Sequence, residues 1–282
     1  ESMNIVGLGK AGCAIADKFS QYPQYKIYKI NTHKSKEPNY LYITPRSSHE
    51  EYEEKTRLRK SFFEDIEGPV LFVIGGSGAI SGVVLRVLER LKHLDIHVLY
   101  IKPDLSLLSE KKELQHRVVF GVLQEYARCD LLKRVFVVDN TNLGSIIGDV
   151  PMMEYYDSIN TLIVSSFHMI NVCMNSSPVL TTFTDIAESA RISTLGLMDS
   201  ESGEEATFYD LEYPRHKLYF YAINRDRLKT DGGLFRKITG QIKEKNDENL
   251  KATFGVYATD YEEDYTYCVH HATFVQEQKI DF

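Results

Sequence analysis

Residues 4–12 read NIVGLGKAG and contain the spacing G-x-G-x-x-G at Gly7, Gly9 and Gly12. An apolar run precedes the glycines and an amphipathic run follows them, so the pattern predicts a strand, a tight turn and a helix. Glycines at such a turn let the backbone approach an anion, and the helix N-terminus favours negative charge. This stretch therefore predicts a loop that binds phosphate, in a dinucleotide or in another ligand.

A dinucleotide site needs one more feature, an acidic side chain at the end of the second strand to hold the ribose hydroxyls. The predicted second strand, residues 25–31, ends in Asn31, and Thr32 and His33 follow it. The Asn31 amide still hydrogen-bonds a ribose or a phosphate. Because the acid is absent, an NAD-dependent oxidoreductase is the weaker interpretation, and we keep it as an alternative.

A second glycine cluster, GGSGAISG at residues 75–82, follows the apolar run PVLFVI and precedes a predicted helix over residues 81–92. Small residues there let successive amides turn toward one anion, and Ser81 is expected to cap the helix. No G-K-[ST] follows, so this is not a Walker A loop. A tight turn without a ligand is the alternative. If the two preceding strands are neighbours, both loops meet at one sheet edge, and a polyphosphate between them explains both.

Strand-like apolar runs alternate with amphipathic stretches through the first half of the chain, which predicts an α/β domain with a parallel sheet covered on both faces. Residues 151–174 are apolar nearly all the way round and predict a buried helix at a domain junction. The remainder predicts a smaller α+β domain. The predicted parts are a domain at 3–150, the helix at 151–174 and a domain at 175–282, with helices near 185–190 and over 234–245 and strands at 216–224, 251–259 and 264–275.

Composition excludes several classes of protein. The chain has 282 residues and a formal net charge of -7 without a basic cluster, which argues against a broad nucleic-acid-binding face. No apolar run is long enough to predict a membrane segment, so we expect a cytoplasmic protein. The cysteines occur singly, which predicts reduced, mostly buried thiols. His270 and His271 lie on opposite faces of a predicted strand, and no metal site is predicted.

The order of these parts resembles the tubulin/FtsZ superfamily of GTPases, which polymerise head to tail into filaments. Residues 75–82 are similar to the signature G-G-G-T-G-[ST]-G, and VFVVDNTNL at 135–143 is similar to the FtsZ strand that ends in I-P-N-D. Residues 180–199 resemble the catalytic loop written N-x-D-F-A-D-V. The resemblance runs from Met3 onward. It implies a Rossmann-like GTPase domain, a long central helix at 151–174 and a smaller activation domain.

The resemblance also implies GTP or GDP as the ligand, with Mg²⁺ as a candidate accompanying ion. Tyr156 would stack on the guanine and Asn160 would read its edge, because residues four apart share one helix face. A core aromatic and an interior amide are the alternatives for these two residues. The phosphate and sugar contacts would come from Gly9, Lys10, Ala11, Gly12, Asn31, Gly76, Gly78, Ser81, Gly82 and Asn140.

Hydrolysis in the superfamily uses acids that the next subunit supplies to orient the attacking water. This chain has Leu180, Thr182 and Asp185 where the family has an asparagine and two aspartates. Asp185 is therefore the catalytic candidate, with Glu188 as its substitute. An acid at the start of a helix is the alternative for Asp185. One acid is missing, so slow hydrolysis is expected.

Two further departures fall in the second glycine cluster, where Ala79 replaces the signature threonine and Ile80 replaces a glycine. They favour an alternative, a nucleotide-binding scaffold of the same fold that lacks hydrolysis. The chain is expected to partner with itself in filaments, and with a DNA-binding adaptor or another cargo adaptor. The layout favours a bacterial or phage protein that positions or segregates DNA or serves division.

Overall fold

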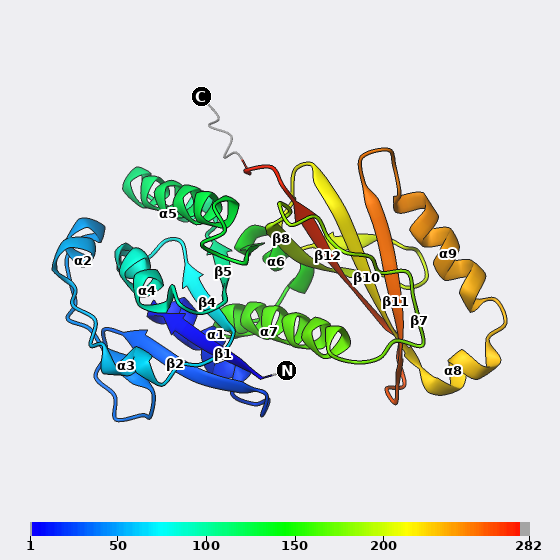
Figure 1. Ribbon diagram of the computed structural model, residues 1–282, viewed down its shortest axis with the longest axis horizontal. Helices are drawn as coiled ribbons and strands as arrows, with labels where there is room; N and C mark the ends of the chain where they lie inside the picture. The colour runs from blue at the N-terminus through cyan, green and yellow to red at the C-terminus, as the bar shows by residue number, and fades with distance from the viewer. Residues whose placement is uncertain (1, 277–282) are drawn as a thin grey trace. The chain divides into compact units, whose positions relative to one another are not determined.

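The computed structural model describes residues 2–276, which divide into two compact units (Figure 1). Unit 1 comprises residues 2–164 and unit 2 comprises residues 165–276. The division falls inside one continuous helix, α7 (Tyr155–Met174). The three-part partition at residues 150 and 174 stays a prediction.

Unit 1 is built on a parallel sheet with the strand order β3-β2-β1-β4-β5-β6. The central strands β1 and β4 are buried along nearly their whole length, because their sequences are apolar at successive positions. Such strands need cover on both faces, so the predicted α/β class is confirmed. The strands are β1 (Met3–Leu8), β2 (Tyr25–Asn31), β3 (Tyr40–Tyr42), β4 (Val70–Gly75), β5 (Ile96–Lys102) and β6 (Arg134–Asp139).

Three helices of unit 1 begin directly after a residue whose side chain caps them. The side chains of Ser48, Ser109 and Asp139 each accept a hydrogen bond from an amide in the first turn of the helix that follows. The helical segments are α1 (Gly9–Phe19), α2 (His49–Lys55), α3 (Ser61–Glu64), η1 (Ala79–Val83), α4 (Val84–Leu91), η2 (Leu105–Leu107), α5 (Glu110–Arg128), α6 (Asn140–Ile147) and η3 (Met152–Glu154), with η marking 3₁₀ turns.

The N-terminal part of the predicted 151–174 helix differs from the prediction. A 3₁₀ turn, η3, comes first, and α7 begins at Tyr155. Met152 and Met153 are 90% and 95% exposed, and complete burial begins only at Ile159. The expectation of a helix buried on every side is therefore wrong for its first turns. The apolar side chains there are not covered by other parts of the described chain.

Unit 2 is built on a mixed sheet with the strand order β8-β12-β10-β11-β7, and β9 pairs with β8. β10 and β11 run parallel, with two helices in the connection between them, and the other pairs are antiparallel. Apolar residues of α9 pack with those of β10 and β11 in one core. The elements are β7 (Leu180–Thr181), β8 (Ile192–Met198), β9 (Glu205–Thr207), β10 (Pro214–Asn224), α8 (Arg225–Thr230), α9 (Leu234–Lys245), β11 (Lys251–Thr259) and β12 (Tyr265–Ala272).

The helix predicted near residues 185–190 is absent, because residues 182–191 form a loop between β7 and β8. Phe183, near the start of this loop, packs against the backbone of Gly255 and against the ring of Phe220. The extended segment is thus held to the sheet before a helical turn could form. The predicted strands of this unit are confirmed, with small changes at their ends.

Three of the four cysteines are buried, as predicted, and Cys129 at the end of α5 is exposed. Burial raises the pKa of Cys13 to about 12 and that of Cys173 to about 11, and Cys268 is completely buried. The helices described between residues 2 and 276 include none with the length and apolar composition that spanning a membrane requires.

Candidate functional site

The two glycine loops leave neighbouring strands at the same edge of the unit 1 sheet. β1 and β4 are paired in parallel, with Leu8 opposite Ile74, and each strand runs directly into its loop. The geometric condition under which the two loops would meet is therefore confirmed. Carboxyl ends of parallel strands are the usual location of ligands in such sheets.

The glycines of the first loop have different structural roles. Gly9 has φ +74, which a side chain would strain, and it forms the turn into α1. A β-carbon on Gly7 would collide with the carbonyl oxygen of Gly12, and one on Gly12 would lie 2.5 Å from the carbonyl oxygen of Val73. These two glycines let α1 lie directly on the sheet. Lys10 and Ala11, between the close contacts, are exposed.

The second loop is packed from two sides. A β-carbon on Gly76 would collide with the hydroxyl of Tyr100, and one on Gly82 would collide with the carbonyl oxygen of His49. The Gly76 amide donates to the carbonyl oxygen of Ile101 at 3.0 Å. Gly76 therefore contributes close packing. Its amide is already bonded within the sheet, so this amide does not donate to an anion as the sequence predicts.

Several hydrogen-bond donors without partners lie directly after Gly76 in the second loop. Within residues 2–276, the amides of residues 77–80 have no hydrogen-bond acceptor, as is usual at the start of a helical turn. The Ser81 hydroxyl is 2% exposed and also lacks a partner there. The predicted capping role of Ser81 is wrong, because the 3₁₀ turn η1 intervenes and α4 begins only at Val84. Loop donors that include Gly78 are thus available to an anion.

A buried polar pair supports this loop, and the sequence gives no signal for it. The Tyr100 hydroxyl lies 2.5 Å from Nδ1 of His116, and the two rings stack with that of Phe120. Burial, reinforced by the nearby Lys102 and Arg117, lowers the pKa of His116 to about 4. The imidazole is therefore neutral at physiological pH and forms a rigid wall behind Gly76.

Asn31 and Asn140 stand at the carboxyl ends of two other strands. Asn31 ends β2 beside the first loop, and its side-chain oxygen accepts a hydrogen bond from the Thr32 amide at 2.8 Å. Asn140 is the first residue of α6, which Asp139 caps. Asp139 also pairs with Lys102 at 3.0 Å, and both side chains are largely buried. This pair fixes the strand end from which Asn140 projects.

The two predicted base-binding residues lie on the first turns of α7, within unit 1. The Tyr155 hydroxyl packs closely on Gly144, which attaches this part of α7 to α6. The Tyr156 ring meets the Tyr155 ring edge to face at 5.3 Å and is 60% exposed. Asn160, one turn later, is half-buried. Tyr156 is therefore not a core aromatic, and its exposed ring is free to stack on a flat ligand.

The predicted catalytic loop belongs to unit 2 and is attached to β11. Thr182 donates its amide to the carbonyl oxygen of Phe254 at 2.8 Å, and its hydroxyl accepts from the Phe254 amide at 3.0 Å. Thr182, which replaces the first family aspartate, thus uses its amide and its hydroxyl in hydrogen bonds to the backbone of Phe254. Its role is to hold the loop.

Asp185 follows in the same loop and is exposed, as is Glu188. The loop is attached again just beyond Asp185, where the Ala187 amide donates to Nε2 of His216 at 3.3 Å. The alternative in which Asp185 begins a helix is wrong, because no helix forms there. Asp185 is presented to solvent between two attachment points.

Unit 2 also contains a buried cluster that the sequence does not predict. Glu205, Cys268 and His270 have potential ligand atoms within 4.8 Å of one another. The Glu205 carboxylate, however, already accepts from His270 Nε2 and the Tyr219 hydroxyl and pairs with Lys245 at 2.8 Å. These donors hold the pKa of Glu205 well below its usual range despite burial. The Glu205 carboxylate is thus engaged by His270, Tyr219 and Lys245, and Lys245 supplies the positive charge.

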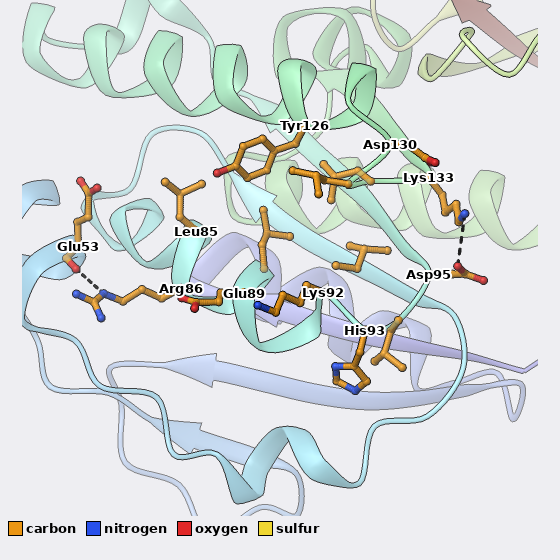
Figure 2. A pocket seen from close by; sticks show the side chains of 15 residues that line it. Glu53, Leu85, Arg86, Glu89, Lys92, His93, Asp95, Tyr126, Asp130 and Lys133 are labelled. Carbon is orange, nitrogen blue, oxygen red and sulfur yellow. Dashed lines mark hydrogen bonds and ion pairs between the residues drawn. The ribbon is translucent and has the colours of Figure 1, made fainter.

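A hollow in unit 1 is separate from the glycine loops. It has a volume of about 750 Å³ and lies between α4 and α5 at the amino end of β5, the sheet edge opposite the loops (Figure 2). Two of its cations are engaged, since Arg86 donates to the Glu53 carbonyl and Lys133 faces Asp95 at 3.7 Å (Figure 2). No group of unpartnered backbone amides like that of residues 77–80 is described in this hollow, so we do not take it as the candidate site.

No protein-family model and no curated protein sequence matches this chain. Solved structures do resemble it. A GTPγS-form protofilament of Bacillus thuringiensis serovar israelensis TubZ has a TM-score of 0.74 at 16% identity, with 96% of this chain and 86% of that chain covered. A TubZ structure described as a type III plasmid segregation protein has a TM-score of 0.69 at 16% identity, covering 95% and 87%. An FtsZ dimer from M. jannaschii has a TM-score of 0.67 at 13% identity, covering 100% and 93%. The chain therefore has the tubulin/FtsZ fold.

Proposed function

We propose that this chain binds GTP at its two glycine loops and assembles head to tail into filaments. The observation that carries the proposal is the set of unpartnered donors at the second loop, the amides of residues 77–80 and the buried Ser81 hydroxyl. Such donors at the end of a parallel strand suit phosphate oxygens. The first loop, with Gly9 and Gly12, begins on the adjacent strand and would contact the same phosphates.

The rest of the nucleotide has candidate contacts in the same unit. Asn31 and Asn140 would reach the sugar from their strand ends, Tyr156 would stack on the guanine, and Asn160 would bind the edge of the base. Neither glycine loop contains an acidic side chain. A Mg²⁺ ion that accompanies GTP would therefore depend chiefly on phosphate oxygens, with Ser81 as a hydroxyl ligand.

Hydrolysis would combine two subunits. Asp185 projects from an anchored loop with no acceptor role inside its own unit, so it is available to orient a water at the GTP of the next subunit. The protofilament form of TubZ supports assembly of this kind. The plasmid segregation TubZ supports a role in DNA positioning or segregation, and division is the other candidate process. Such a role would need an adaptor that joins the filament to its cargo.

Sedimentation and electron microscopy test the proposal directly. The protein should pellet as filaments with GTP and remain in the supernatant with GDP or without nucleotide. A thermal-shift comparison of GTP, GDP and NADH should show stabilisation by the guanine nucleotides alone, because a ligand stabilises the state that binds it. Absence of both guanine-nucleotide binding and filaments over a range of protein concentrations would sink the proposal. Stabilisation by NADH would instead favour the oxidoreductase.

The second candidate function is a scaffold that binds nucleotide and assembles without hydrolysis. The bonding of Thr182 to the Phe254 backbone favours it, because this hydroxyl is not available to activate water. Phosphate release from the wild type, Asp185→Ala and Glu188→Ala separates the two functions. A GTPase should lose roughly a hundredfold or more in rate on Asp185→Ala and little on Glu188→Ala. GTP-dependent filaments with no phosphate release in the wild type would establish the scaffold.

A further inference from the structure

Ile80 lies between the two glycine loops. Its Cγ2 is the atom nearest to the β-carbon position of Gly9, at 2.7 Å, and it lies 3.5 Å from the same position on Gly78. The Ile80 side chain therefore rests against the backbone of Gly9, the first residue of α1. Ile80 is half-buried, so part of its surface remains exposed to solvent.

This placement puts a branched apolar side chain between the start of α1 and the second loop, whose amides are unpartnered. Phosphate oxygens must approach amides to roughly 2.7–3.2 Å, and any side chain over the amides takes up that space. The Ile80 side chain offers no donor of its own. It covers the start of α1, where the helix N-terminus would otherwise attract an anion.

We propose that Ile80 sets the affinity of this cradle for nucleotide phosphates, by filling the space between Gly9 and Gly78. The inference rests on the proposed GTP site. A phosphate chain that enters the first loop has to displace the Ile80 side chain, so removal of that side chain strengthens binding.

The same contact stabilises the loops when no nucleotide is bound, because it removes apolar surface of Ile80 from water. Truncation at Ile80 should therefore have two opposite effects, a lower melting temperature without ligand and a tighter complex with GTP. A residue with only a structural role would weaken both, since a loosened loop binds less well.

The test compares Ile80→Ala with Ile80→Val by calorimetric titration with GTP and by melting without nucleotide. Alanine removes the carbon that touches Gly9, and we expect GTP affinity to increase about tenfold, equivalent to about 1.4 kcal/mol. Valine keeps both carbons attached to Cβ, so its affinity should stay within about twofold of the wild type.

Wild-type protein that binds GTP, together with an Ile80→Ala variant of equal or weaker affinity, would overturn the inference and leave the proposed function intact. Failure of both proteins to bind GTP would overturn the proposed function and the inference with it. Tightening in both variants would also contradict the role of the Gly9 contact.

Discussion

Substitution of Gly12 by alanine should loosen α1 from the sheet. The new methyl carbon would lie 2.5 Å from the Val73 carbonyl oxygen, whereas ordinary contact begins at 3.4 Å. The backbone fixes the position of the β-carbon, and its partner is a backbone oxygen, so no side-chain rotation relieves the collision and the helix itself has to shift. Insertion of a methyl group into a packed site typically costs 1–3 kcal/mol, and the rigid partners put Gly12→Ala near the upper end, at about 3 kcal/mol.

Thermal and urea unfolding followed by circular dichroism, without nucleotide, measures this cost. A loss of about 3 kcal/mol should lower the melting temperature by about 6–12 °C in a unit of this size. Gly121→Ala is the matched control, because Gly121 lies inside α5 and no atom is within 4 Å of its β-carbon position. It should stabilise the protein by up to about 1 kcal/mol, since alanine favours helix. Wild-type stability in Gly12→Ala, or an equal loss in Gly121→Ala, would refute the reasoning.

Three further predictions concern unit 1. Tyr156→Ala should weaken GTP binding by about 1 kcal/mol, or roughly fivefold in a titration, while Tyr156→Phe retains the affinity and neither changes the melting temperature without ligand; loss of stability in the alanine variant would contradict an exposed ring. Burial lowers the pKa values of His97 and His116 to about 4, so the unfolded chain gains protons first as the pH falls below about 6.5. Stability in urea should be full above pH 6.5 and decrease toward pH 4 by up to about 1.4 kcal/mol per pH unit for each histidine, and an unchanged slope in His97→Asn would oppose this. Lys102→Met leaves the Asp139 carboxylate buried without its cation and should cost about 2–3 kcal/mol in the same assay. Asp139→Asn still caps α6 and should cost less. Equal losses in the two variants would contradict the view that the unpaired buried charge causes the destabilisation.

Local patterns were sufficient for most of the fold. The glycine spacing, the apolar strands and the helix over residues 234–245 are confirmed because each depends on neighbouring residues alone. The parallel pairing of β1 with β4 depends on the alternation of strands and helices, which the sequence also contains.

Failures occurred where distant residues decide the structure. The predicted 185–190 helix is replaced by a loop because Phe183 packs on Gly255, far away in the sequence. The hydroxyl of Thr182 is occupied by Phe254 for the same reason. The contact of Tyr100 and His116 with Gly76 is visible only in the structure, because no pattern near these residues in the sequence predicts it.

The uneven burial of the cysteines gives the protein a ready set of chemical reporters. Cys129 is accessible and should accept a single fluorophore in the native chain, which makes assembly measurable without any substitution. Cys13 lies in unit 1 and Cys268 in unit 2, and each becomes reactive only when its surroundings open. Their alkylation rates in mild denaturant, followed peptide by peptide in a mass spectrometer, would tell which half of the chain unfolds first.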